Sequence, residues 1–246
     1  MIELRGFSKS YKTKAAVRDV SLSATTGSIT GLLGPNGSGK TTILKAAAGV
    51  HLATGGRVLV EGCDAAADPR RARSLAGYAP ESPGFKGDFT VREMLFLTAP
   101  IALEGRGRES GKNAVRDAVE GAVETLGLRD VLSARTVHLS KGYVQRLSLA
   151  LALLGDPPAL ILDEPASGLD PAQIYDLREL LRKLSAHKTV LLSTHLIQEA
   201  ESLCSTLHVL RDGGLAASGT REELCAATGE PTLEQAYLAL CGGPRE

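Results

Sequence analysis

Neither sign of charge is in excess in this sequence, because 28 lysine and arginine residues are balanced by 28 aspartate and glutamate residues. A chain without net charge has no long-range attraction for a polyanion, and non-specific binding to nucleic acid depends on such an attraction. We therefore expect no nucleic acid partner.

Cysteine is scarce and scattered. The four residues, Cys63, Cys204, Cys225 and Cys241, show none of the short paired spacings that zinc and redox sites use. We expect the reduced thiols of a cytosolic protein. The opening segment MIELRGFSKSYKTK agrees with this expectation, because it carries charges where a secretion signal would carry an apolar stretch.

Long apolar runs are also missing. Crossing a bilayer takes about 20 predominantly apolar residues. The richest runs here, residues 94–103 and 147–154, are much shorter. We expect that this chain does not cross a membrane by itself.

The regular elements that are present begin with short strands. A length of 246 residues fits one large domain, or one domain with an inserted lobe. Apolar stretches bounded by turn residues predict strands at residues 2–7, 28–33 and 57–61. In residues 159–210, buried strand patterns alternate with amphipathic helices, which indicates βαβ units and a parallel sheet.

A helical lobe is expected between these two parts. Thr90 and Glu93 form a capping box that predicts a helix over residues 91–103. After a polar connection at residues 104–111, a second apolar face predicts a helix that ends at Gly127. We expect one domain with the following parts: an α/β core with a β subdomain (1–81 and 156–228), an inserted helical subdomain (82–155) and a short helical tail (229–246).

The segment GPNGSGKT fits the phosphate-binding pattern G-x-x-x-x-G-K-[ST], and it lies between a predicted strand and a predicted helix. Glycines let backbone N–H groups point at phosphate, and the helix N-terminus adds partial positive charge. Lys40 would reach the β- and γ-phosphates, and Thr41 would ligate Mg²⁺. The candidate phosphate-binding residues are Gly34, Pro35, Asn36, Gly37, Ser38, Gly39, Lys40, Thr41 and Thr42.

Polar side chains also follow two later strands. Asp163 and Glu164 come after the apolar run PALIL; Asp163 can hold Mg²⁺, and Glu164 can orient or deprotonate an attacking water. His195 ends the run TVLLST, at the sheet edge where open α/β proteins bind ligands, so we expect it to contact the γ-phosphate. The candidate catalytic residues are therefore Lys40, Glu164 and His195.

Taken together, these motifs resemble the ATPase subunit of an ATP-binding cassette (ABC) transporter. The resemblance extends over residues 2–240 and rests on LSKGYVQRLSLALAL, ILDEPASGLDP and STHLIQEAE, with Tyr11 upstream. It implies an α/β fold with a P-loop NTPase (RecA-like) core, an N-terminal antiparallel β subdomain and an inserted α-helical subdomain. It also implies ATP and Mg²⁺ as cofactors.

The resemblance assigns roles to residues outside the phosphate loop. Tyr11 would stack on adenine with help from Val17, although it also fits an ordinary strand end. Asp170 would lie in the loop through which two subunits communicate. Because two cassettes of this family pack head to tail, Ser140 and Gly142 would bind the γ-phosphate of ATP held by the partner. A helix N-terminus suits an anion, but a plain helix start remains the alternative.

Two departures from the family pattern stand out. In the usual Leu-Ser-Gly-Gly-Gln motif, Lys141 here takes the place of a Gly and Tyr143 that of the Gln. Glu81 stands where most members carry a Gln; it offers oxygen to a metal but no amide donor, and its alternative is a solvent-exposed loop acid. These departures, with the tail TLEQAYLAL, resemble the exporter branch.

The resemblance thus implies an ATPase that dimerises on two Mg-ATP and hydrolyses them with Glu164 as base. It would drive separate transmembrane permease subunits docked near Glu81 and the helical lobe, at the cytoplasmic face of the membrane. The second cassette would be another copy or a related chain. A soluble ABC ATPase for cofactor or cluster assembly is the alternative; kinases and GTPases are disfavoured because nothing resembles Asn-Lys-x-Asp. The sequence does not reveal a transported substrate.

Overall fold

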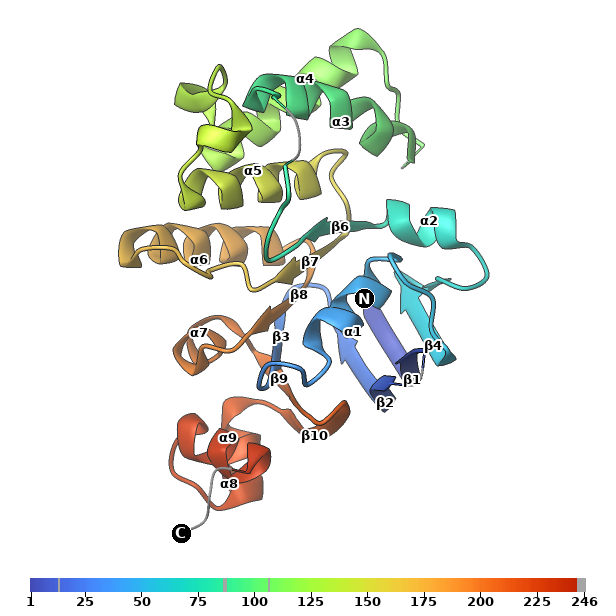
Figure 1. The fold of residues 1–246 in the computed structure, drawn as a ribbon, viewed down its shortest axis with the longest axis vertical. Helices are drawn as coiled ribbons and strands as arrows, with labels where there is room; N and C mark the ends of the chain where they lie inside the picture. Colours follow the sequence, from blue (N-terminus) through green and yellow to red (C-terminus); the bar gives the residue numbers. More distant parts are fainter. Residues whose placement is uncertain (13, 86–87, 106, 243–246) are drawn as a thin grey trace.

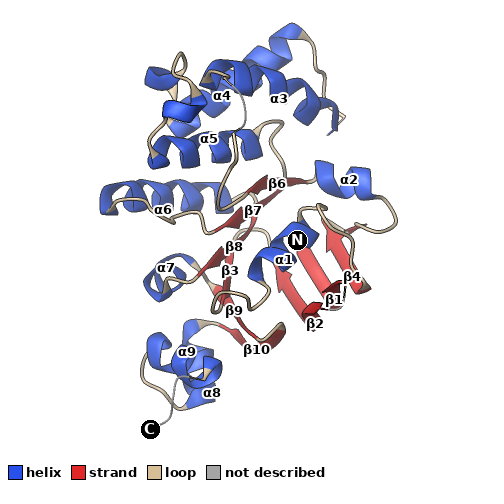
Figure 2. Cartoon of the chain, in the orientation of Figure 1, coloured by secondary structure: helices blue, strands red, loops and turns tan. Residues whose placement is uncertain are grey.

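The computed structural model describes residues 1–12, 14–85, 88–105 and 107–242. Two sheets and several layers of helices make up the molecule (Figures 1 and 2). The first sheet is antiparallel, with strand order β2-β1-β4-β5. Its strands are β1 (Ile2–Tyr11), β2 (Lys14–Ala24), β4 (Gly55–Val60) and β5 (Cys63–Asp64).

The second sheet is larger and runs through the middle of the molecule, with strand order β10-β9-β3-β8-β7-β6. Five of its strands are parallel, and β10 pairs with β9 antiparallel. The strands are β3 (Ile29–Leu33), β6 (Ala76–Ala79), β7 (Ala159–Asp163), β8 (Thr189–Thr194), β9 (Thr206–Arg211) and β10 (Gly214–Gly219). All residues of β3, β7 and β8 are buried, as expected of strands covered on both faces.

Helices cover the sheets and extend the molecule at both ends (Figure 1). Helix α1 follows β3 directly, and its residues Ile43 and Leu44 pack in one core with the inward side chains of the antiparallel sheet. This packing holds the start of α1, and with it the phosphate loop. The helices of this part are α1 (Lys40–Ala47), α2 (Pro69–Ser74), α6 (Pro171–Ser185), α7 (Ile197–Leu203), α8 (Arg221–Thr228) and α9 (Leu233–Cys241).

A helical lobe lies between β6 and β7 in the chain, although these two strands are neighbours in the sheet. It contains α3 (Val91–Gly105), α4 (Lys112–Leu126) and α5 (Lys141–Leu153), and two short 3-10 helices, η1 (Arg129–Val131) and η2 (Thr136–His138). Its buried residues join those of α6, β7 and β8 in one core. The lobe is therefore packed on the central sheet rather than attached by a free linker.

The local signals at the helix ends are confirmed. Glu93 donates its backbone N–H to Thr90 Oγ1 at 3.2 Å, and its carboxylate accepts from the Thr90 N–H at 2.8 Å. Gly127 ends α4 in the left-handed conformation with φ 60. The connection at residues 104–111 includes residue 106, which lies outside the described part of the chain.

Strand β2 is the main element that the sequence did not predict. Its buried residues Val17, Val20 and Leu22 are spaced by three and then by two, so strict alternation fails. The irregular spacing comes from a β-bulge against β1, beside Asp19, whose φ is 48. The predicted α/β fold class, with its antiparallel subdomain and helical insertion, is confirmed. Within the part of the chain that the structure describes, every helix is too short or too polar to span a bilayer.

Candidate nucleotide-binding site

The phosphate loop leaves the carboxyl end of β3 and enters α1 at Lys40. Glycine is required by crowding at Gly34, where a Cβ would lie 2.4 Å from the Leu210 carbonyl oxygen. At Gly39 the φ of 106 is left-handed, and a Cβ would lie 2.8 Å from Val17. Both positions therefore admit only glycine without strain, and the tight curl of the loop follows from them.

Lys40 is buried, with 6% of its surface exposed, and its ammonium is held inside the loop. It donates to the carbonyl oxygens of Gly34 at 2.6 Å and Pro35 at 3.3 Å. The Glu164 carboxylate lies 3.9 Å away. Burial lowers the pKa of Lys40, and the charge of Glu164 opposes that shift. The loop thus presents a positioned cation beside an acid.

Asp163 joins the phosphate loop to the neighbouring strand. Its Oδ1 accepts hydrogen bonds from Thr41 Oγ1 at 3.2 Å and from Ser193 Oγ at 2.7 Å. Ser193 lies opposite Asp163 in the parallel register of β7 and β8. The predicted metal ligands Thr41 and Asp163 are therefore already in contact, and Ser193 is a buried partner that the sequence did not single out.

Glu164 is held from three sides. Its backbone N–H donates to Ser193 Oγ at 3.0 Å, and its carboxylate Oε2 lies 2.8 Å from His195 Nδ1 and 3.3 Å from the His195 backbone nitrogen. The residue itself has a φ of 49, which is uncommon for any residue other than glycine. This strained backbone turns a buried carboxylate toward the loop, beside Lys40.

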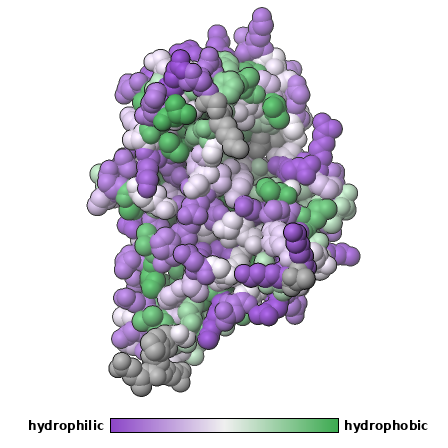
Figure 3. Space-filling model, in the orientation of Figure 1, coloured by the Kyte–Doolittle hydropathy of each residue, from purple (hydrophilic) through white to green (hydrophobic). Residues whose placement is uncertain are grey.

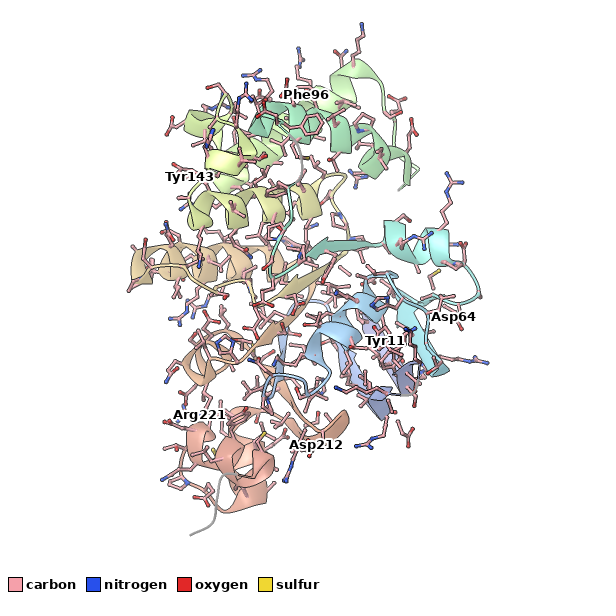
Figure 4. The ribbon with its side chains drawn as sticks, viewed as in Figure 1. Tyr11, Asp64, Phe96, Tyr143, Asp212 and Arg221 are labelled. Atoms are coloured by element: carbon pink, nitrogen blue, oxygen red, sulfur yellow. The ribbon has the colours of Figure 1, made fainter. Side chains whose placement is uncertain are left out.

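A cavity of ≈ 630 Å³ opens over these groups. Ten predicted site residues line it: Tyr11, Asn36, Gly37, Gly39, Lys40, Thr41, Thr42, Glu81, Glu164 and His195. Among the described residues, the lining also includes some that were not predicted: Lys14, Ala15, Ala16, Asp212 and Gly213. These come from the start of β2 and the turn between β9 and β10, and they join the site only through tertiary packing. Figure 4 labels Tyr11 and Asp212, which lie on the same side of the molecule.

Four predicted residues lie in or behind the loop rather than on the cavity wall. Val17 is buried beneath Gly39, so the structure does not place it at the cavity surface. Gly34 and Ser38 are buried, and Pro35 contributes its carbonyl oxygen to Lys40. They shape the loop instead of facing the space above it.

Tyr11 stands at the mouth of the cavity and is 42% exposed. The His51 ring meets it edge-on, with the ring centroids 5.6 Å apart and the planes at 80°. Lys9 Nζ lies 5.3 Å from the Tyr11 centroid and donates to the Leu52 carbonyl at 2.7 Å. The tyrosine is therefore steadied by two neighbours while part of its ring stays accessible.

Glu81 is exposed and lines the cavity just after β6. Tyr78, three residues earlier, is half-buried beneath the site. Burial, followed by the charge of Asp163, raises the pKa of Tyr78, with a smaller contribution from Glu81. Tyr78 is a second neighbour of the acidic cluster that the sequence did not indicate.

The structure does not bring Ser140, Gly142 and Asp170 to this cavity. Ser140 caps α5 by accepting from the Tyr143 N–H at 3.5 Å, and Asp170 caps α6 by accepting from the Gln173 N–H at 2.9 Å. In Figure 4, Tyr143 lies in the helical lobe, far across the view from Tyr11. The predicted site residues thus fall into two groups on one chain.

Comparisons with known proteins show the family of this chain. A protein-family model described as ABC transporter matches residues 17–167. The Nod factor export ATP-binding protein I of Rhizobium johnstonii is 39% identical over 219 residues, which are 89% of this chain and 68% of that protein. An uncharacterised ABC transporter ATP-binding protein of Bacillus subtilis is 35% identical over 224 residues, covering 91% of this chain and 72% of that protein.

Solved structures extend the likeness to the fold. The structure of the ATP-binding subunit of an ABC transporter superposes with a TM-score of 0.86 at 29% identity, and the match covers 98% of this chain and 99% of that one. A dimeric bacterial ABC transporter cassette gives 0.80 at 25% identity, covering 89% and 98%. The phosphate loop, the acids behind it and these relationships lead to one conclusion: the chain belongs to the ABC transporter family and is an ATP-binding, ATP-hydrolysing subunit.

Proposed function

We propose that this chain powers export, as one of two cassettes that bind ATP between them and drive separate membrane-spanning subunits. The direction of transport is supported by the name of the Rhizobium johnstonii relative, a Nod factor export ATP-binding protein. The observation that carries the proposal is the buried Glu164 carboxylate, aimed beside Lys40 and paired with His195 at the wall of one cavity.

In the proposed reaction, Lys40 and the loop amides bind the phosphates, and Tyr11 stacks on the adenine. Glu164 orients a water and accepts its proton, while His195 fixes the carboxylate through the contact at 2.8 Å. The Lys40 ammonium lies 3.9 Å from this carboxylate, at the side where the phosphates would bind.

Mg²⁺ suits the oxygen ligands at this site. Thr41 and Asp163 lie within 3.2 Å of each other and would hold it, with Glu81 available at the cavity wall. Among the described residues, no group of three His, Cys, Asp or Glu side chains forms a metal site of its own. When bound, Mg²⁺ neutralises charge on the phosphate oxygens.

The second cassette is needed because Ser140 and Gly142 do not face their own cavity. We propose that they meet the nucleotide held by a partner, either another copy or a related chain, as a helix N-terminus suits a phosphate. The dimeric cassette among the similar structures supports this pairing.

The membrane subunits would dock on the helical lobe, at the cytoplasmic face of the membrane. Helix α3 exposes Phe96, Leu97 and Ile101, with Ile101 73% exposed. Figure 3 shows hydrophobic side chains on the surface of this lobe, at the top of the view. Exposed apolar groups of this kind mark interaction sites.

The test is purification of the tagged protein from its native membranes. We expect an integral membrane protein to be recovered with it, and a Leu97→Glu, Ile101→Glu variant to lose that partner while keeping ATP binding. The matched control is Leu238→Glu, because this exposed leucine lies on α9, at the end of the molecule opposite the lobe. A soluble protein recovered in place of a membrane protein would support assembly or repair instead of transport.

A further inference from the structure

The residues 140–143, here called the signature segment, are packed against another part of their own chain. Gly142 is buried, and a Cβ added to it would lie 2.6 Å from Gln173 Nε2 and 2.8 Å from Gln173 Cδ. Glycine at this position is helical rather than left-handed, so its backbone conformation does not demand glycine. A side chain at position 142 would instead have to displace the end of the Gln173 side chain.

Gln173 is in turn held by Asp170. The two residues form a reciprocal capping box at the start of α6, in which Gln173 N–H donates to Asp170 Oδ1 at 2.9 Å and Gln173 Oε1 accepts from Asp170 N–H at 3.3 Å. The Gln173 amide therefore lies between Gly142 and the loop of residues 167–170. Displacing it would open one side of the cap.

Two further contacts join the same segments. The Lys141 side chain lies on Gly168, whose φ is 74 and whose added Cβ would come 3.0 Å from Lys141 Nζ. One turn further along each helix, Arg146 of α5 pairs with Asp176 of α6 at 3.2 Å. The start of α5 thus lies alongside the loop and the first turn of α6, with contacts made by Lys141, Gly142 and Arg146.

We propose that Gln173 is a positioning residue that fixes the signature segment to the loop of residues 167–170, so that both reach the partner cassette as one unit. In this arrangement Gly142 keeps the Gln173 amide in place because it has no side chain of its own. The inference rests on the proposed pairing of two cassettes. It goes beyond that pairing, because it assigns the glycine a requirement within its own chain.

The experiment is a double-mutant cycle of Gly142→Ala and Gln173→Ala, made in a Glu164→Gln parent and measured by thermal unfolding and by solution mass with ATP. Alanine is the better helix former, so in the Gln173→Ala background the change at position 142 should raise Tm by about 2–4 °C. With Gln173 present that gain should vanish, because the new methyl group displaces the amide. The matched control is Gly121→Ala in α4, where an added Cβ meets nothing within 4 Å and Tm should rise in either background.

The mass measurement tests the positioning role. Gly142→Ala should weaken ATP-dependent dimerisation by about 10-fold when Gln173 is present, and the double variant should recover to the level of Gln173→Ala alone. Nucleotide binding to the monomer should stay unchanged throughout, since neither residue lines the cavity.

Three other outcomes would each contradict one step of the proposal: the contact, the positioning role or the pairing of cassettes. Equal Tm changes from Gly142→Ala with Gln173 present and in the Gln173→Ala background would overturn the contact. Coupled Tm changes with dimerisation still lost in the double variant would show that Gly142 acts on phosphate alone, and would overturn the positioning role. A parent that stays monomeric with ATP would overturn the proposed pairing instead, while the Tm cycle, which needs no dimer, would still report the contact.

Discussion

The cavity over Lys40 and the signature segment differ in how complete they are within one chain. Around the cavity, Asp163 and Glu164 are buried at 2% and 8% exposure, and each is hydrogen-bonded by side chains of its own chain. Ser140, in contrast, is exposed, and its hydroxyl accepts a hydrogen bond from the first turn of its own helix. The first site is assembled by folding, whereas the second offers a preformed helix end to something outside the chain. The comparison implies that the residues for hydrolysis and the residues for contact with a partner lie in separate parts of this molecule.

The largest expected effect is on the rate of ATP hydrolysis, when Glu164 in the cavity is changed. Glu164→Gln keeps the shape of the side chain but removes the base, so the turnover number should fall about 10²–10⁴-fold while ATP still binds. Steady-state phosphate release measures the change, and Glu179→Gln, an exposed acid on α6 paired with Arg182, is the matched control. Ordinary turnover in Glu164→Gln would remove this residue from the role of base.

A second prediction tests whether the two sites meet across two chains. Lys40→Ala should inactivate a chain through its cavity, and Ser140→Arg through its signature segment. Mixing the two variants should restore part of the ATPase activity, since the intact cavity of one then faces the intact segment of the other. A mixture of Lys40→Ala with a chain carrying both changes should stay inactive. Two variants that fail to complement each other would place both functions on one chain.

A smaller effect is expected at the mouth of the cavity. Tyr11→Ala removes a stacking surface, and ATP affinity should fall about 10-fold, in line with the measured cost of losing one base–aromatic contact. Tyr11→Phe should bind nearly as well as the parent, because the ring is kept. Titration calorimetry gives both affinities; if Tyr11→Ala binds as tightly as the parent, then Tyr11 is only the end of a strand.

The smallest expected effect is a pH dependence of ATP affinity, which arises from the buried Lys40. Burial lowers the pKa of Lys40 from 10.5. Lys40 is charged at pH values below its pKa and loses its charge as the pH rises through that pKa. ATP affinity should therefore decline by a few-fold as the pH rises from about 7 to about 10, at a lower pH than for an exposed lysine. Lys40→Arg should show no such decline, because arginine stays charged. A parallel decline in both proteins would point to another group.

The sequence was informative where signals are local or where a motif carries its own geometry. Thr90 and Glu93 predicted the start of α3, and Gly34 to Thr41 predicted a phosphate loop between a strand and a helix, as found. The family and the fold class were also correct.

The features that the sequence could not predict depend on register and packing between distant segments. Ser193 contacts Asp163 because β7 and β8 pair in a particular register, and Asp212 reaches the cavity through a turn far along the chain. A serine at the end of a buried strand next to the acidic strand was the one available signal, and only the strand order makes it meaningful. Gln173 had one local signal, its capping-box spacing from Asp170, but its place beside Gly142 exists only after two helices have packed.

The left-handed backbone at Glu164 also bears on how this sequence can change over time. A residue with φ 49 is one where glycine or asparagine would be conformationally easier. Strain of this kind costs about 1–3 kcal/mol and persists only where the surroundings enforce it. Selection for stability alone would therefore favour replacement at 164, while selection for ATP turnover opposes it. A library sorted only by heat resistance should therefore lose glutamate at position 164, and with it the enzyme.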